Sequence, residues 1–139
     1  MSAQQTNTLV EAGTARGGTN WILLVDDDVD LRETMQALLE DDGYQVVAAE
    51  DGADALRRLP DMPLPDLIIL DLQMPRLNGV GFMAAFAKNP AWTDVPVLIV
   101  SGDPRGAEKA AQMGAHGYLV KPVRIHELSV VVAKMSGHS

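Results

Sequence analysis

Charged residues directly follow three strongly apolar runs of this sequence. A carboxylate gains nothing from burial in an apolar core, and burying it unpaired is costly. Each carboxylate at such a position is therefore expected at an exposed strand end or beside a cation. The apolar runs and the charged residues after them are Ile22–Val25 with Asp26–Asp28, Leu67–Leu70 with Asp71, and Gly117–Val120 with Lys121.

Phosphoryl transfer is the chemistry that these residues suit. Carboxylates gathered at one place repel each other unless a cation neutralises them, and oxygen ligands with room for water favour Mg²⁺. Lys121 adds a second positive charge, and Ser101, which follows the apolar run Val97–Val100, adds a hydroxyl donor. Positioning and charge neutralisation dominate phosphoryl transfer, and a carboxylate can form an acyl phosphate. Asp71 is the candidate nucleophile.

The composition indicates one acidic domain. The chain has 139 residues, a net charge of −8 and no cysteine. Disulfides, thiolate catalysis and Cys-based zinc sites are thus excluded, and the charge argues against binding to a nucleic-acid backbone as the main activity. No apolar run has the length of a membrane span, and no signal peptide is visible. We expect a cytoplasmic protein whose partners are neither nucleic acids nor membranes.

Apolar runs and helical patterns alternate five times after a polar start. Residues 1–20 are predicted to be a flexible tail, residues 21–136 one domain and residues 137–139 the C-terminal end, with no output domain after it. The predicted strands are Trp21–Val25, Tyr44–Ala49, Leu67–Leu70, Val97–Val100 and Gly117–Val120. Five helices are predicted. The first two have Asp28 and Asp51 as N-caps, and Pro60 ends the second. The third begins near Asn78-Gly79, the fourth begins at Asp103-Pro104, and the fifth covers Ile125–Met135.

This alternation predicts an α/β fold, a five-stranded parallel sheet with helices on both faces. In such sheets the functional site lies outside the carboxyl ends of the strands. The candidate residues all fall at those ends: Asp26, Asp27, Asp71, Ser101 and Lys121. The convergence of these five residues is the strongest inference from the pattern alone.

Four motifs in this order resemble the receiver domain of two-component response regulators, the CheY-like family. They are ILLVDDD, LIILDLQMPRLNG, LIVSGD and GYLVKP, and the likeness extends from about Trp21 to Met135. The resemblance implies a flavodoxin-like (βα)5 fold with strand order 2-1-3-4-5. It also implies a signalling switch rather than an enzyme, although the domain assists its own phosphorylation and dephosphorylation.

The resemblance assigns a phosphoacceptor and a metal site. Asp71 resembles the family's phosphoacceptor and is also a Mg²⁺ ligand. Asp27 resembles the direct Mg²⁺ ligand, Asp26 the neighbour that holds the ion through water, and Gln73 supplies a backbone carbonyl.

The resemblance also assigns residues that contact the phosphoryl group and transmit its presence. Ser101 resembles the family's hydroxyl residue that bonds the phosphoryl group, and Lys121 the lysine that pairs with it. Tyr118 stands where an aromatic residue moves inward when Ser101 moves, and Gly102 where a small residue keeps access open. Lys121-Pro122 stands where the family has a cis peptide bond.

The implied function is a Mg²⁺-dependent phosphorylation switch. A phosphohistidine on a sensor histidine kinase or a His-phosphotransfer protein gives its phosphoryl group to Asp71. The fourth helix, fifth strand and fifth helix, residues 105–135, then change as a surface for an unidentified downstream protein. The chain is either a single-domain regulator or a receiver from a larger protein.

Other functions are less consistent with the sequence. An acidic helix start explains Asp28 but not Asp26 and Asp27. An aspartyl-phosphate phosphatase would need an acid–base aspartate where Gln73 stands. A flavin carrier would need a Ser/Thr/Gly-rich phosphate loop after the first strand. The main alternative is a pseudo-receiver that binds partners without phosphorylation, and it would lack an acidic or lysine position that this chain has.

Overall fold

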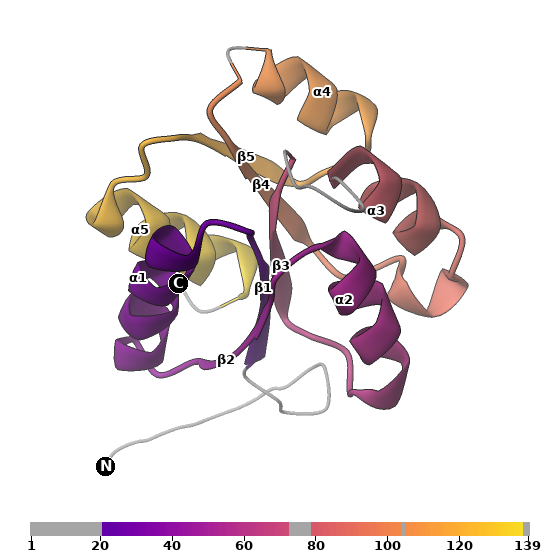
Figure 1. Ribbon diagram of the computed structural model, residues 1–139, viewed down its shortest axis with the longest axis horizontal. Helices are drawn as coiled ribbons and strands as arrows, with labels where there is room; N and C mark the ends of the chain where they lie inside the picture. The colour runs from indigo at the N-terminus through magenta and orange to yellow at the C-terminus, as the bar shows by residue number, and fades with distance from the viewer. Residues whose placement is uncertain (1–20, 73–78, 104, 138–139) are drawn as a thin grey trace.

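Residues 21–72, 79–103 and 105–137 are described by a computed structural model (Figure 1). The predictions for the tail 1–20, for Gln73 and for the helix entry at Asn78 and Pro104 lie outside these residues, as do residues 138–139 of the C-terminal end.

Five parallel strands form one sheet in the order β2-β1-β3-β4-β5 (Figure 1). The central strands β1, β3 and β4 are buried along their whole length. This burial explains why they are continuous apolar runs, since helices cover both faces of a parallel sheet. The strands are β1 (Trp21–Val25), β2 (Gln45–Ala49), β3 (Leu67–Asp71), β4 (Val97–Ser101) and β5 (Gly117–Val120).

The helices divide between the two faces of the sheet (Figure 1). They are α1 (Val29–Asp41), α2 (Gly52–Arg58), α3 (Gly79–Ala87), α4 (Gly106–Gln112) and α5 (Ile125–Met135), with short 3-10 helices η1 (Leu59–Asp61) and η2 (Pro90–Trp92). Helices α1 and α5 cover one face, and α2, α3 and α4 lie on the other. In the described part of the chain, no helix has the length and apolarity to cross a membrane.

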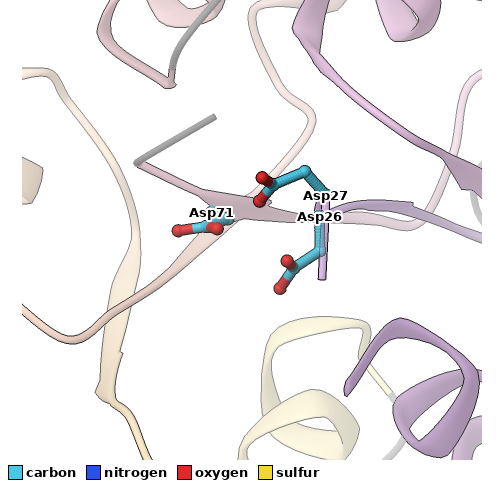
Figure 2. Close-up of side chains that lie close together, drawn as sticks. All are labelled: Asp26, Asp27 and Asp71. Carbon is cyan, nitrogen blue, oxygen red and sulfur yellow. The ribbon is translucent and has the colours of Figure 1, made fainter. Parts of the chain in front are cut away.

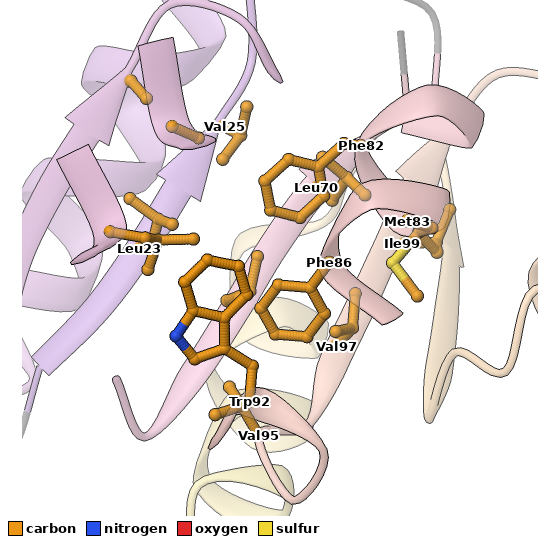
Figure 3. Packing of buried hydrophobic residues seen from close by; sticks show 14 of the residues in the cluster. Leu23, Val25, Leu70, Phe82, Met83, Phe86, Trp92, Val95, Val97 and Ile99 are labelled. Carbon is orange, nitrogen blue, oxygen red and sulfur yellow. The ribbon is translucent and has the colours of Figure 1, made fainter. Parts of the chain in front are cut away.

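Side chains from alternating strand positions fill two separate cores. Leu23 of β1 faces the core under α2, α3 and α4, whereas its neighbour Leu24 faces α1 and α5. The first core contains an aromatic stack in which the ring of Phe86 lies 5.5 Å from that of Phe82 and 5.2 Å from that of Trp92 (Figure 3). Packing on both faces fixes the strand positions and therefore the level at which each strand ends.

The predicted fold class, the strand order and two helix caps are confirmed. The Asp28 carboxylate accepts a hydrogen bond from the Leu31 amide at 3.1 Å, and that of Asp51 accepts one from the Asp54 amide at 2.8 Å. Each satisfies a backbone donor that the helix leaves unpaired. The Lys121-Pro122 peptide bond is cis, as the resemblance implied.

One helix boundary differs from the prediction. Helix α4 begins at Gly106 instead of near Asp103, because the Asp103 carboxylate accepts from the Arg105 amide (2.8 Å) in a turn that precedes the helix. Arg105 occupies the N-cap position without a side-chain capping bond. The second helix ends as predicted: α2 stops at Arg58 with Leu59 as its C-cap, directly before Pro60. Pro60 then lies in the first turn of η1, where a missing amide hydrogen costs nothing.

The fold predicts different effects for two isoleucines replaced by the same residue. Ile69 in β3 is 1% exposed, and Ile69→Ala is expected to lower the free energy of unfolding by about 2–5 kcal/mol because it leaves a cavity in the core. Ile125 is 55% exposed, so Ile125→Ala should change it by less than about 0.5 kcal/mol. Urea denaturation followed by circular dichroism measures both, and equal effects would contradict the packing described.

Candidate functional site

The register of the sheet brings three carboxylates together. Val25 pairs with Leu70, so the residues after them, Asp26 and Asp71, lie level at the carboxyl edge of the sheet. Potential ligand oxygens of Asp26, Asp27 and Asp71 all lie within 4.8 Å of one another (Figure 2). Asp26 is 1% and Asp71 4% exposed, whereas Asp27 is exposed. Two of the three negative charges are therefore buried.

Lys121 places its ammonium group between the two buried carboxylates. Its Nζ lies 3.3 Å from Asp71 Oδ2 and 3.4 Å from Asp26 Oδ2. Partial burial lowers the pKa of Lys121, but the attraction of Asp26 and Asp71 outweighs that effect and raises it overall. Lys121 therefore keeps its positive charge at neutral pH.

The two oxygens of the buried Asp26 carboxylate differ in their hydrogen bonding. Oδ1 accepts a hydrogen bond from the Asp28 amide at 2.9 Å. Oδ2 is buried and makes no hydrogen bond to the described residues, although Lys121 lies near it. A guanidinium nitrogen of Arg32 donates to the backbone carbonyl of Asp26 at 2.7 Å and so fastens the end of β1 to α1.

These observations fit a divalent cation. Lys121 brings one positive charge against three carboxylates, and carboxylates this close repel each other without further neutralisation. All-oxygen ligands of this kind suit Mg²⁺. The Oδ2 atom of Asp26 has the Lys121 ammonium 3.4 Å away and makes no hydrogen bond to the described residues, so it can also accept a bond from a water bound to such a cation.

Ser101 ends the neighbouring strand and is fully buried. Its hydroxyl oxygen accepts a hydrogen bond from the Asp103 amide at 3.1 Å, and its backbone carbonyl accepts from the Lys121 amide at 2.9 Å. Ser101 thus fixes the main chain of Lys121. Because a serine hydroxyl both donates and accepts, the bond from Asp103 leaves its own proton for another acceptor.

Tyr118 reaches from β5 to the start of α4. Its hydroxyl donates to the backbone carbonyl of Asp103 at 2.8 Å, and the carbonyl of Ser101 lies 3.3 Å away. Burial, with a smaller effect from Asp103, raises the pKa of Tyr118. A Cβ atom on Gly106 would lie 2.2 Å from the Tyr118 hydroxyl oxygen, so this ring position requires a glycine there.

The structure gathers most of the residues that the sequence singled out. Asp26, Asp27, Asp71 and Lys121 form one cluster, and Ser101 adjoins it through the backbone of Lys121. The Gln73 carbonyl lies outside the described residues.

Sequence reasoning missed three residues: Arg32 beside the cluster, Gly106 beside Tyr118, and Lys109, whose Nζ lies 2.6 Å from the Asp103 carboxylate. Each acts through a contact between separate elements, and none belongs to a motif that could have marked it.

Comparison with known proteins gives the family. The model of the response regulator receiver domain matches residues 22–133. The chain belongs to this family. The chemotaxis protein CheY4 of Vibrio cholerae has a similar structure, with a TM-score of 0.78 and 29% identity over 85% of this chain and 99% of that one. The receiver domain of NtrX from Brucella abortus gives 0.75 and 30% over 85% and 99%.

Curated relatives include longer proteins. The transcriptional regulatory protein CpxR of Escherichia coli is 38% identical over 109 residues, which are 78% of this chain and 46% of CpxR. The rice response regulator-like protein PRR73 is 36% identical over 77% of this chain and 14% of its own length. The chain thus spans less than half of these relatives. Because CpxR is a transcriptional regulator, the absence of a nucleic-acid partner stays a prediction.

Membership places the chain among the signalling switches of two-component systems. Receiver domains interact with histidine kinases or phosphotransfer proteins, and they typically bind Mg²⁺ at an acidic pocket. The acidic cluster of Asp26, Asp27 and Asp71 corresponds to such a pocket in its composition.

The contact between Gly106 and Tyr118 makes a prediction about ring position. Gly106→Ala should displace the Tyr118 hydroxyl from its partly buried position, so the pKa of Tyr118 should fall towards the ordinary value of about 10. Titration of ¹³Cζ-labelled tyrosines by NMR measures this, with Tyr44 as an internal reference that should not change. An unchanged titration of Tyr118 would show that the ring does not need the space at Gly106.

Proposed function

We propose that this chain is a phosphoacceptor that receives a phosphoryl group on Asp71. The donor is a phosphohistidine of a sensor histidine kinase or a His-phosphotransfer protein. The observation that carries the proposal is the buried Asp71 carboxylate with the Lys121 ammonium 3.3 Å away, at the edge of the sheet where the acidic cluster lies. A buried nucleophile beside a fixed positive charge suits phosphoryl transfer, because the positive charge stabilises the negative charge of the phosphoryl oxygens in the transition state.

The transfer is a displacement at phosphorus. A carboxylate oxygen of Asp71 forms the new O–P bond as the N–P bond of the donor breaks, and the imidazole leaves with the electron pair of that bond. Lys121, held protonated by Asp26 and Asp71, stabilises the charge on the phosphoryl oxygens. Ser101 offers its hydroxyl proton to one of these oxygens, since its acceptor side already holds the Asp103 amide.

Mg²⁺ is the cofactor in this proposal. Asp27, Asp71 and the backbone carbonyl of Gln73 would hold the ion directly, and Asp26 would hold it through a water molecule. When bound, the ion supplies charge neutralisation for the transferred group. The buried Oδ2 atom of Asp26, which makes no hydrogen bond to the described residues, supports the role of Asp26 as a ligand through water.

A pocket beside Lys121 supports an approach route for the donor. Asp28, Leu31, Lys121, Pro122 and Val123 line it, between the start of α1 and the residues that follow β5. Val29 lies exposed at the start of α1. An apolar rim beside Lys121, the lysine that pairs with Asp71, suits docking of a partner helix that carries the phosphohistidine.

The consequence of phosphorylation is a change at the surface of α4, β5 and α5. The added charge draws the Ser101 hydroxyl, and Ser101 is bonded through Asp103 to Tyr118 and α4. A downstream protein would distinguish the two states of that surface, and the protein acts as a cytoplasmic switch rather than an enzyme. No observation favours a pseudo-receiver, because Asp26, Asp27, Asp71, Ser101 and Lys121 are all present.

Intact-mass spectrometry after incubation with acetyl phosphate tests the proposal. The wild type should gain one phosphoryl group in the presence of Mg²⁺ and none after chelation, and Asp71→Asn should gain none under either condition. Circular dichroism of Asp71→Asn controls for folding. Equal labelling of the variant and the wild type would contradict the assignment of Asp71. Where no label appears, binding of beryllofluoride separates a protein that selects its donor from one without an active site.

A further inference from the structure

Asp103 connects four parts of the structure through four different atoms. Its amide donates to the Ser101 hydroxyl oxygen at 3.1 Å, and its carbonyl accepts from Tyr118 at 2.8 Å and from the Gly106 amide at 2.9 Å. Its carboxylate accepts from the Arg105 amide at 2.8 Å and from Lys109 Nζ at 2.6 Å. The position of one residue therefore decides the contacts of the candidate site, β5 and α4.

Among these partners, Lys109 is the one whose side chain reaches Asp103 from within helix α4. The Lys109–Asp103 pair is the short, charge-assisted kind of hydrogen bond, and its effect is large enough to lower the pKa of Asp103. The Lys109 side chain is about half exposed, so the pair is partly screened by salt. The pair spans six positions in sequence and links the turn before α4 to the helix itself.

We propose that Lys109 is a positioning residue for Ser101. Its ion pair with Asp103 holds the turn after β4 so that the Asp103 amide occupies the acceptor side of the Ser101 hydroxyl and the Asp103 carbonyl receives Tyr118. The proposal rests on the proposed function, in which Ser101 donates to the phosphoryl group on Asp71. Lys109 itself contacts neither group.

The physical reason is preorganisation. A serine hydroxyl rotates freely unless a partner fixes one side of it, and a fixed hydroxyl loses less entropy when it bonds the phosphoryl group. Without the Lys109 ammonium, the Asp103 carboxylate keeps only the bond from Arg105 among its described partners, and the turn gains alternative conformations. The Ser101 hydroxyl then meets the phosphoryl group less often in the correct orientation.

Hydrogen exchange of backbone amides with solvent tests, without any phosphoryl group, whether the Lys109–Asp103 ion pair holds the turn after β4. In Lys109→Met, the Asp103 and Gly106 amides should exchange about two- to fivefold faster than in the wild type, the range expected for a partly exposed ion pair. Lys109→Arg should restore slow exchange. Lys88→Met is the matched control: it removes the same charge from an exposed site with no ion pair among the described residues, and it should leave both amides unchanged.

A double-mutant cycle separates the ion pair from other effects of the lysine. In an Asp103→Asn background, Lys109→Met should no longer change the exchange of the Gly106 amide. High salt should accelerate this exchange in the wild type and leave Lys109→Met unaffected. Equal amide exchange in Lys109→Met and Lys88→Met would overturn the proposal.

Beryllofluoride, which mimics the phosphoryl group, tests the consequence for the site. With Mg²⁺ present, its dissociation constant should be about two- to fivefold higher for Lys109→Met than for Lys88→Met, two variants of equal net charge. Equal constants would overturn the positioning role. Failure of the wild type to bind beryllofluoride would instead contradict the proposed function. The amide exchange rates would still decide whether Lys109 holds the turn after β4.

Discussion

The ammonium group of Lys121 between two buried carboxylates is the interaction on which this structure depends. Asp26 and Asp71 are held level by the pairing of β1 with β3, and neither could be buried at that edge without a nearby cation. The lysine reaches them because Ser101 fixes its backbone at the end of β5. With Asp27 added, the site retains excess negative charge, so the same arrangement that stabilises the fold also attracts a divalent cation.

The second consequence of this arrangement is a connection from the sheet edge to helix α4. Ser101 bonds Lys121 through its carbonyl and Asp103 through its hydroxyl, and Asp103 in turn bonds Tyr118 and Lys109. Charge added next to Lys121 therefore acts on a group with partners in two other elements. In the proposed function, this chain of contacts gives a physical basis for coupling a phosphoryl group on Asp71 to the surface of α4.

Local patterns in the sequence were enough to predict the α/β class and to place most candidate residues at one edge of the sheet, whereas the strand order came from the resemblance to receiver domains. Apolar runs followed by a polar or charged residue mark strands, and the carboxyl ends of parallel strands meet at one edge of the sheet. The start of α4 was predicted two to three residues too early, because Asp103 has the side chain of an N-cap but uses it in a preceding turn. Gly106 and Lys109 were missed because their partners, Tyr118 and Asp103, come from other elements or turns, and no spacing rule relates them.

The most direct test of the central claim is to locate the phosphorylated residue. Borohydride reduces an acyl phosphate and leaves a reduced side chain that survives digestion, so peptide mass spectrometry can read its position. After phosphorylation with Mg²⁺ and acetyl phosphate, the account predicts reduction at position 71 alone, although Asp26 and Asp27 lie within 4.8 Å. Reduction at Asp26 or Asp27, or a phosphoryl group that borohydride does not remove, would contradict it.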